Sequence, residues 1–425
     1  MPNPFRHYEG VPVLDLPGEP PGLSDGPAFL SALLFYSAAI SATKQVPSTG
    51  YRYALRVNPS SGNLHPTEFH FATLGLRAWP DGLYHYRPSS HMAEQRARGN
   101  FGGPITFFLT SIAWREAWKY QDRAYRYCLL DMGHAWQALA LSARAIGCES
   151  FATGHFADAE IARLLGTHED EWPMLIVTLK GDSIPVRDPD AGETEWFGGH
   201  ANALSEQQVP YPLIREIHAS TSLLRELAPA QAFTRSGETR HFRDVARTRR
   251  SALDFAGGTK SMSPAQLSAI LDFASEPLAA DFAGARFIQL YLYVHRVDGL
   301  QPGVYRHGPD GLKSIEAGDQ RVIAAGLSLR QDLAGNACVA FSMIADLDRA
   351  AALHGDRGYR YAHFEAGAIG HRLYLAAEAH GLRATGIGAF FDDEVHRYLN
   401  LTSGERQVVY HFAIGYPVAD RRLNA

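Results

Sequence analysis

A lysine and a tyrosine stand next to each other at Lys119 and Tyr120, where the stretch WREAWKY ends. A lysine amine can remove a proton once its surroundings lower its pKa, and a tyrosine hydroxyl can donate or relay one. The pair could therefore assist a reaction in which a substrate loses a proton. The same stretch also suits the end of an amphipathic helix with a solvated lysine, and the residues alone favour neither interpretation. Neighbouring residues of a helix project in different directions, so joint action requires a bend or a loop here.

A second candidate is the turn-rich stretch RVNPSSGNLHPTE, which begins at Arg56. Backbone N–H groups, the hydroxyls of Ser60 or Ser61 and the carboxamide of Asn63 could face one polar ligand, because an amide side chain both donates and accepts hydrogen bonds. Arg56 could lie near the same ligand. Taken alone, the segment from Pro59 onward would be an ordinary loop with an Asx turn.

Two basic groups lie further along the chain. Arg249, Arg250 and Ser251 precede a helix predicted to begin at Ser263-Pro264. Arginine offers paired donors that match phosphate oxygens, although a solvated basic turn would look the same. Arg421, near the C-terminus, could add positive charge to such a site.

The stretch GIGAF at 386–390 contains two glycines, Gly386 and Gly388, followed by Ala389. Glycine lacks a Cβ, so the backbone can approach a ligand closely there. The alternative is a purely structural role, as a tight turn before a helix that begins at the sequence DDEV.

The remaining chemistry-bearing residues point to no metal or disulfide site. His65, His70, His85 and His91 lack a metal-binding spacing and are interpreted as structural or surface groups, and His134 as a packed core residue. The three cysteines are widely spaced, which is typical of buried thiols in a reducing, cytoplasmic protein. The net charge of −5 gives no reason to expect a nucleic-acid partner, and no apolar run is long enough to span a membrane.

The elements that position these residues form a degenerate repeat. Residues 125–156 and 359–390 align without a gap, at an offset of 234, with 11 identities in 32 positions. Both copies show helical spacing of apolar residues, and Gly147 or Gly381 follows the last turn as a helix cap. Residues 30–38 and 267–275 form a second matching pair. One fold is therefore expected twice in the chain.

The repeat predicts an α+β protein with two tandem domains, each a mainly antiparallel sheet flanked by helices and together an intramolecular pseudo-dimer. The predicted domains are an N-terminal extension at 1–23, half 1 at 24–182, a linker or cover segment at 183–239 and half 2 at 240–425. A helix is predicted at 215–227. The strand candidates are 68–74, 83–86, 105–111 and 174–180 in half 1, and 286–294, 303–306, 338–344 and 407–414 in half 2.

These motifs, in this order, resemble the FMN-dependent nitroreductase superfamily and, more narrowly, its SagB-type, azoline-dehydrogenase-like branch. In that family two subunits build each flavin site. The Pro-Ser-x-x-Asn loop comes from one subunit, and the Arg-x-Ser-type arm, the glycine-rich turn and a C-terminal basic residue come from the other. By resemblance, the adjacent Lys-Tyr pair is catalytic.

The two halves divide these motifs between them. Half 1 has the loop at 59–63, where half 2 has Ala280 to Gly284; half 2 has the arm at 249–251, where half 1 has Pro12 to Leu14. Each half keeps what the other lacks, so one flavin site is expected per chain, between the halves. Lys119 and Tyr120 are its expected catalytic residues. The expected cofactor-binding residues are Arg56, Pro59, Ser60, Ser61, Asn63, Arg249, Arg250, Ser251, Gly386, Gly388, Ala389 and Arg421.

The resemblance implies an FMN-dependent oxidoreductase that binds about one FMN per chain and acts on a small-molecule or peptide substrate. The reaction would be dehydrogenation of an azoline ring in a modified peptide or reduction of a substrate with NAD(P)H as electron donor. The alternative is a degenerate, flavin-free scaffold or partner in a peptide-modifying complex. Whether chains pair further stays open.

Overall fold

The computed structural model describes residues 1–20, 22–167, 169–190, 192–224, 242–283, 286–401 and 406–423. The chain divides into two compact units, and each includes a short segment from the other half of the sequence. Unit 1 comprises Met1–Thr43, Ala54–Arg247 and Pro277–Gly284, and unit 2 comprises Lys44–Tyr53, Thr248–Glu276 and Ala285–Ala425.

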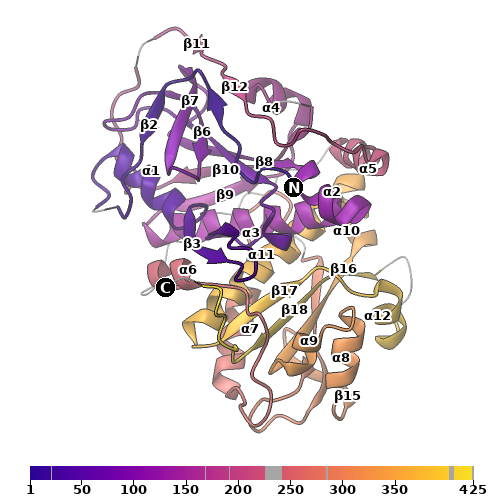
Figure 1. The fold of residues 1–425 in the computed structure, drawn as a ribbon. Coiled ribbons are helices and arrows are strands. Elements are labelled where there is room, and N and C mark those ends of the chain that lie inside the picture. The colour runs from indigo at the N-terminus through magenta and orange to yellow at the C-terminus, as the bar shows by residue number, and fades with distance from the viewer. Residues whose placement is uncertain are drawn as a thin grey trace. The chain divides into compact units, whose positions relative to one another are not determined.

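Unit 1 is built on an antiparallel sheet whose strands run in the order β11-β7-β6-β5-β8-β10-β9, with β2 beside β7 (Figure 1). These strands are β2 (Val13–Asp15), β5 (Thr67–Thr73), β6 (Gly82–Arg87), β7 (Met92–Arg98), β8 (Ile105–Ile112), β9 (Glu149–Thr153), β10 (Glu171–Lys180) and β11 (Glu195–Trp196). The helices are α1 (Gly26–Phe35), α2 (Ala113–Tyr120), α3 (Ala124–Ala145), α4 (Asp158–Leu165), α5 (Pro212–Ser222) and α6 (Phe242–Thr248), whose last residue belongs to unit 2.

Two small strand pairs lie outside the main sheets. β1 (Tyr8–Glu9) pairs with β12 (His200–Ala201), and β3 (Ile40–Gln45) pairs with β4 (Arg52–Arg56).

Unit 2 contains a six-stranded antiparallel sheet in the order β15-β14-β13-β16-β18-β17. Its strands are β13 (Ile288–Val294), β14 (Gly303–Gly308), β15 (Gly311–Ala317), β16 (Val339–Asp346), β17 (Arg383–Ile387) and β18 (Arg406–Gly415). Its helices are α7 (Pro264–Ser275), α8 (Arg321–Leu327), α9 (Asp332–Asn336), α10 (Leu347–His354), α11 (Gly358–Ala379) and α12 (Asp392–Tyr398).

The two sheets repeat one topology. The order β7-β6-β5-β8-β10-β9 in unit 1 corresponds strand for strand to β15-β14-β13-β16-β18-β17 in unit 2. The helices α3 and α11 are equally long, at 22 residues, and the glycines Gly147 and Gly381 after them have φ of +81° and +72°. Left-handed glycines of this kind close a helix. The predicted α+β fold class, with one fold present twice, is confirmed.

Each predicted strand candidate coincides with a strand of these sheets. The helix predicted to begin at Ser263-Pro264 is α7, where the Ser263 side chain and the Gln266 side chain form a reciprocal capping box. The helix predicted at 215–227 begins earlier, at Pro212, and ends at Ser222; residues 225–227 lie outside the described residues.

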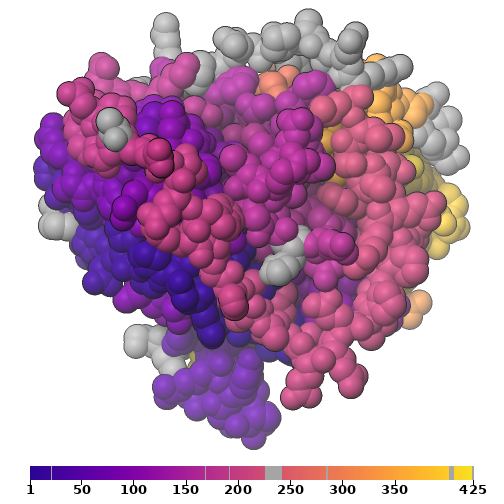
Figure 2. All heavy atoms as spheres, turned by 90° about the horizontal axis from the view of Figure 1, so that it is seen from above, coloured from indigo at the N-terminus to yellow at the C-terminus, as the bar shows by residue number. Residues whose placement is uncertain are grey.

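The segment after β10 runs back over unit 1, as a cover segment would. Arg187 donates to the Asp81 carboxylate at 3.1 Å, and the backbone N–H of Phe197 donates to the carbonyl of Arg96 at 2.9 Å. Part of this segment appears in Figure 2 as rose spheres against the indigo and purple of the earlier strands. Within the described ranges, no helix combines the length and the apolar character needed to cross a bilayer.

A network of buried charges lies on the sheet of unit 1, beneath the N-terminal segment. His85 lies between Glu68 at 3.3 Å and Glu94 at 2.9 Å, and His70 contacts Glu171 at 2.7 Å. Hydrogen bonds to the two glutamates raise the pKa of His85 although burial opposes its charge, whereas burial lowers the pKa of His70.

The histidines singled out in the sequence are structural rather than surface groups. His65, His70 and His85 are buried, and His91 contacts Ser31 and Tyr86. Of the two predicted alternatives, structural or surface groups, these contacts support the structural one. His134 is buried in α3, as predicted.

We expect Glu68→Gln to lower the free energy of unfolding by about 3–5 kcal/mol, because the buried Arg115 would lose its ion-pair partner. Burial would raise the pKa of Glu68, but Arg115 lowers it to about 2. The contribution of Glu68 is therefore complete above the pKa of an unfolded glutamate, about 4.3, and fades as the pH falls toward 2.

Urea unfolding at pH 7 and pH 4 measures this effect, which should shrink at the lower pH. The exposed pair Arg397–Glu394 provides the matched control, since Glu394→Gln should change stability by less than about 1 kcal/mol. An equally small effect for Glu68→Gln would contradict a stabilising role for the buried pair.

Candidate functional site

The loop from Pro59 to Asn63 has an unusual backbone. Residues Ser61–Asn63 form one turn of 3₁₀ helix, in which Gly62 and Asn63 have φ of +58° and +61°. Left-handed conformations cost little for glycine and are tolerated by asparagine. The residue types in this loop are therefore explained in part by the turn itself.

The polar side chains of the loop point into unit 1. The Ser61 hydroxyl donates to Asp131 at 3.0 Å, and the Ser60 hydroxyl lies 3.5 Å from Glu116. The Asn63 amide donates to the carbonyl of Ala54 at 2.8 Å, and its oxygen lies 3.0 Å from Nε2 of His65. Each of these side chains already has a partner within the unit, and their predicted contact with a flavin stays a prediction.

The side chains of Lys119 and Tyr120 converge on the exposed Gly62. A Cβ built on Gly62 would lie 2.6 Å from the Tyr120 hydroxyl and 3.1 Å from the Lys119 amine. The bend that this convergence requires is present, because α2 ends at Tyr120 and Gln121 has φ of +52°. Thus the structure brings the predicted catalytic pair and the predicted cofactor loop together at one surface point.

Two buried carboxyls lie under the loop and were missed by the sequence analysis. Burial and the nearby Asp131 charge raise the pKa of Glu116 well above its usual value, and burial raises the pKa of Asp131 to about 7. The repeat held a signal: at the offset of 234, Asp131 matches Glu365, whereas Glu116 matches Ala350. One acid is thus shared by both halves, and the other belongs to half 1 alone.

In unit 2, the arm at 249–251 and the glycine-rich turn meet at one tyrosine. The Tyr374 hydroxyl lies 2.8 Å from the Ser251 hydroxyl and accepts the N–H of Gly386, also at 2.8 Å. The Arg249 guanidinium lies 5.0 Å from the centre of the Tyr374 ring. Arg249 and Arg250 are both buried. The structure therefore places the arm beside the turn, as the sequence hypothesis requires of a shared site.

The two glycines of the turn differ in their surroundings. A Cβ on Gly386 would collide with the Tyr410 hydroxyl at 2.0 Å, so packing inside unit 2 already requires glycine there. Gly388 follows strand β17, and the carbonyl of Ala389 accepts a hydrogen bond from Gln331 at 3.2 Å.

The two remaining candidates, Arg421 and Arg56, have contrasting positions. Arg421 is exposed, while its neighbour Arg422 is held by Asp420 at 2.8 Å. Arg56 is buried; its guanidinium donates to the carbonyl of Pro4, and burial lowers its pKa to about 10. Arg56 thus contacts the N-terminal segment at Pro4 and Phe5.

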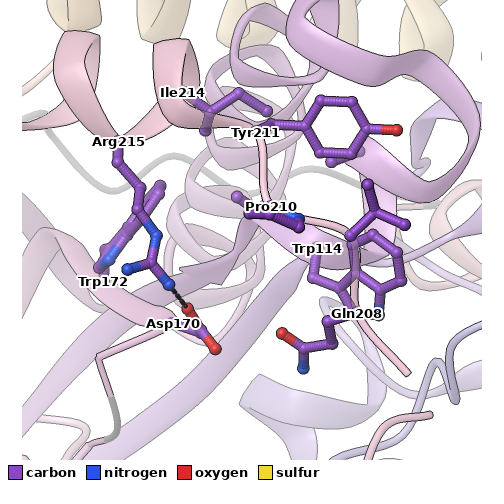
Figure 3. Close-up of a pocket in the computed structure, with 11 residues that line it drawn as sticks. Trp114, Asp170, Trp172, Gln208, Pro210, Tyr211, Ile214 and Arg215 are labelled. Carbon is purple, nitrogen blue, oxygen red and sulfur yellow. Dashed lines mark hydrogen bonds and ion pairs between the residues drawn. The ribbon is translucent and has the colours of Figure 1, made fainter. Parts of the chain in front are cut away.

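A small pocket of about 240 Å³ opens on the other side of α2 (Figure 3). An ion pair between Arg215 and Asp170, 2.8 Å long, stands at one side, opposite Trp114 and Gln208. The volume suits a group of side-chain size rather than a larger organic ligand. The lining residues are Ala113, Trp114, Ala117, Asp170, Trp172, Gln208, Val209, Pro210, Tyr211, Ile214 and Arg215. Among the residues placed by the structure, no cluster of three or more His, Cys, Asp or Glu side chains could hold a metal.

Comparison with known proteins gives two curated relatives. The protein MJ1384 of Methanocaldococcus jannaschii, named as a candidate nitroreductase, is 32% identical over 125 residues, which cover 28% of this chain and 62% of that protein. The microcin B17-processing protein McbC of Escherichia coli is 28% identical over 147 residues, which cover 30% of this chain and 54% of McbC. The chain thus spans less than two thirds of the length of either relative.

A solved structure and a family comparison agree with the duplicated topology. The crystal structure of a candidate nitroreductase from Anabaena variabilis matches with a TM-score of 0.81 and 26% identity, over 98% of this chain and 94% of that one. The model of the nitroreductase family matches twice, at residues 38–181 and 246–416. The two matches fall on the two copies of the repeated sheet, and the chain belongs to the nitroreductase family.

Proposed function

We propose that this nitroreductase-family protein is an FMN-dependent oxidoreductase in which Lys119 and Tyr120 move protons at the substrate. The observation that carries the proposal is the convergence of the Lys119 amine and the Tyr120 hydroxyl on Gly62, in the loop that the family resemblance assigns to the flavin. A lysine and a tyrosine at one exposed point form an acid–base pair on a surface that a substrate can reach.

The residues present fit an FMN in two respects. Gly62 leaves room in front of the Lys119–Tyr120 pair, where a Cβ would not fit. The paired arginines Arg249 and Arg250 are of the type that binds phosphate, and their arm is joined to the glycine-rich turn through Tyr374. We propose that one FMN uses the loop at 59–63 together with the arm at 249–251, the turn at 386–389 and Arg421.

The substrate chemistry divides between cofactor and protein. When bound, FMN supplies two-electron, hydride-accepting chemistry. Lys119 takes up the proton that leaves the substrate, and the Tyr120 hydroxyl donates a hydrogen bond to a substrate heteroatom. Lys119 is exposed, and its amine lies at the same point over Gly62 as the Tyr120 hydroxyl, where a substrate can reach both.

The substrate class that we propose is an azoline-containing peptide, and the reaction is removal of two electrons and two protons to give the azole, with the electrons and one proton leaving as hydride. The likeness to McbC, whose name describes processing of microcin B17, supports a peptide substrate. The name nitroreductase supports the reverse direction, in which NAD(P)H donates hydride and an organic acceptor is reduced. Both reactions share the flavin and the pair Lys119–Tyr120.

A second candidate function is a flavin-free scaffold in a peptide-modifying complex. The observation that favours it is that Ser60, Ser61 and Asn63 already have partners inside unit 1. Because the polar side chains of this loop make hydrogen bonds within unit 1, the loop can keep its conformation without a bound ligand.

We expect the purified protein to be yellow and to bind about one FMN per chain, because each flavin-site motif is present once. Absorbance of the protein, followed by release of the flavin in denaturant, measures the ratio. A colourless protein that does not take up added FMN would leave the scaffold as the function, whereas two FMN per chain would refute a single site.

A further inference from the structure

A buried carboxyl stands one helical turn before the proposed catalytic pair. Glu116 has no exposed surface and, at three and four positions before Lys119 and Tyr120, shares their side of α2. At the equivalent place in α10, the other half has Ala350, which is also fully buried. The helix therefore packs in unit 2 without an acid. Burial of a carboxyl costs free energy, so the packing of the helix alone does not explain an acid at this position.

The carboxyl next to it, Asp131 on α3, holds the loop. Its two oxygens accept the N–H of Ser61 at 3.0 and 3.1 Å, and the Ser61 hydroxyl adds a third contact at 3.0 Å. In unit 2 the equivalent Glu365 accepts the N–H groups of Phe287 and Ile288 at 2.9 and 3.1 Å. A carboxylate that tethers backbone amides is thus common to both halves.

The contacts decide which of the two acids carries a proton. Two donors, the N–H and the hydroxyl of Ser61, stabilise the ionised form of Asp131 through three contacts. The Ser60 hydroxyl lies 3.5 Å from Oε1 of Glu116, and a side-chain hydrogen bond with Asp131 raises the pKa of Glu116, because a protonated Glu116 can donate to the Asp131 carboxylate. Two buried carboxyls so close to each other cannot both ionise readily. Burial and the charge of Asp131 raise the pKa of Glu116, so the proton resides on Glu116.

The groups around Glu116 show what its charge would affect. Asp131 and Cys128 face it from α3, Ser60 faces it from the loop, and Lys119 and Tyr120 follow it on α2. Of these, Lys119 is the only cation. An ionised Glu116 would be a partner for Lys119 at the i,i+3 spacing and would hold it as an ammonium, which cannot accept a proton.

We propose that Glu116 is a positioning residue, kept as a neutral acid beside the ionised Asp131, whose neutrality leaves the Lys119 amine free to accept a proton from the substrate. This inference rests on the proposed function, since it assigns Glu116 a role in supporting the base Lys119. Glu116 does not reach the substrate itself.

The first test asks about the proton alone and needs no flavin. Infrared spectra of the full chain at pH 7 should show the carbonyl band of a buried protonated carboxylic acid. Burial raises the pKa of Asp131 and of Glu365 to about 7, so these acids also contribute to this band. The component of the band that belongs to Glu116 should be lost from Glu116→Gln and retained in Glu394→Gln, an exposed control. If the wild-type protein shows no band that Glu116→Gln removes, the inference is overturned, whatever the protein does with FMN.

The second test compares pH profiles. Reduction of bound FMN by a thiazoline-containing dipeptide is followed for the wild type and Glu116→Gln between pH 6 and pH 9. Because glutamine stays neutral, the two rates should agree at pH 6. The variant should be about tenfold faster at high pH, where only the wild type carries a negative charge beside the base. A merely structural role would change the rates by the same factor at every pH, and that result would overturn the inference.

A third variant separates neutrality from packing. Glu116→Ala copies the residue of the other half and should follow the pH profile of Glu116→Gln, at a lower stability. If Glu116→Gln keeps the wild-type rate at pH 6 but Glu116→Ala does not, a neutral residue at this position is not sufficient. The shape of the side chain would then be required, and the inference would be overturned. A wild-type protein that binds FMN but never transfers hydride from the dipeptide would refute the proposed substrate, while the infrared band still decides the state of Glu116.

Discussion

Lys119→Ala should slow the reduction of bound FMN by a thiazoline-containing dipeptide about 10²–10⁴-fold, which is the usual contribution of a general base. Lys119 is exposed at the end of α2, and its amine lies beside the Tyr120 hydroxyl over Gly62. Its removal should therefore slow the reaction without lowering the stability of the fold. Stopped-flow absorbance of the flavin measures the rate, and the flavin content of the purified variant should equal that of the wild type.

The duplicated fold offers a matched control for this substitution. Leu353 occupies the place of Lys119 in α10 and is 40% exposed, so Leu353→Ala makes the same truncation on the equivalent helix. We expect Leu353→Ala to leave the rate unchanged. If Lys119→Ala instead loses FMN, or if both variants slow the reaction equally, Lys119 is not the base.

The fold was predictable where the strands carry apolar alternation, and less so where the buried face is charged. Strand β7, MAEQRAR, was missed because Glu94 and Arg96 look like solvent-facing residues. In the structure both are buried: Glu94 contacts His85, and Arg96 lies over the Tyr8 ring at 3.6 Å. The apolar-inside pattern fails here because the N-terminal segment supplies charged and aromatic partners from far away in the sequence.

The site residues that belong to short, contiguous sequence motifs could be predicted from the sequence. The meeting of Lys119, Tyr120 and Gly62 follows from three short motifs, yet their convergence depends on the end of α2 and could only be stated as a requirement. Glu116 was missed because its partners lie on other elements: Ser60 is 56 positions away, and Asp131 is on α3. The repeat alone distinguishes Glu116, since its counterpart Ala350 is not an acid.

The arm at 249–251 leads to the second large expected effect. The double variant Arg249→Ala/Arg250→Ala should weaken FMN binding at least about 100-fold. A hydrogen bond to a charged group contributes about 1.5–3 kcal/mol, and two such groups together exceed the free energy of a 100-fold change. Titration of the flavin-free protein with FMN, followed by quenching of flavin fluorescence, measures the affinity.

Because both arginines are buried, the variant must also be shown to fold. Circular dichroism and thermal unfolding without FMN should match a control, Arg243→Ala, which removes an exposed arginine just upstream in α6 and should not change the affinity. A folded double variant with unchanged affinity would mean that the arm does not reach the phosphate. Phosphate recognition would then have to come from elsewhere, and Arg421, which is exposed beside the C-terminus, would be the next residue to replace.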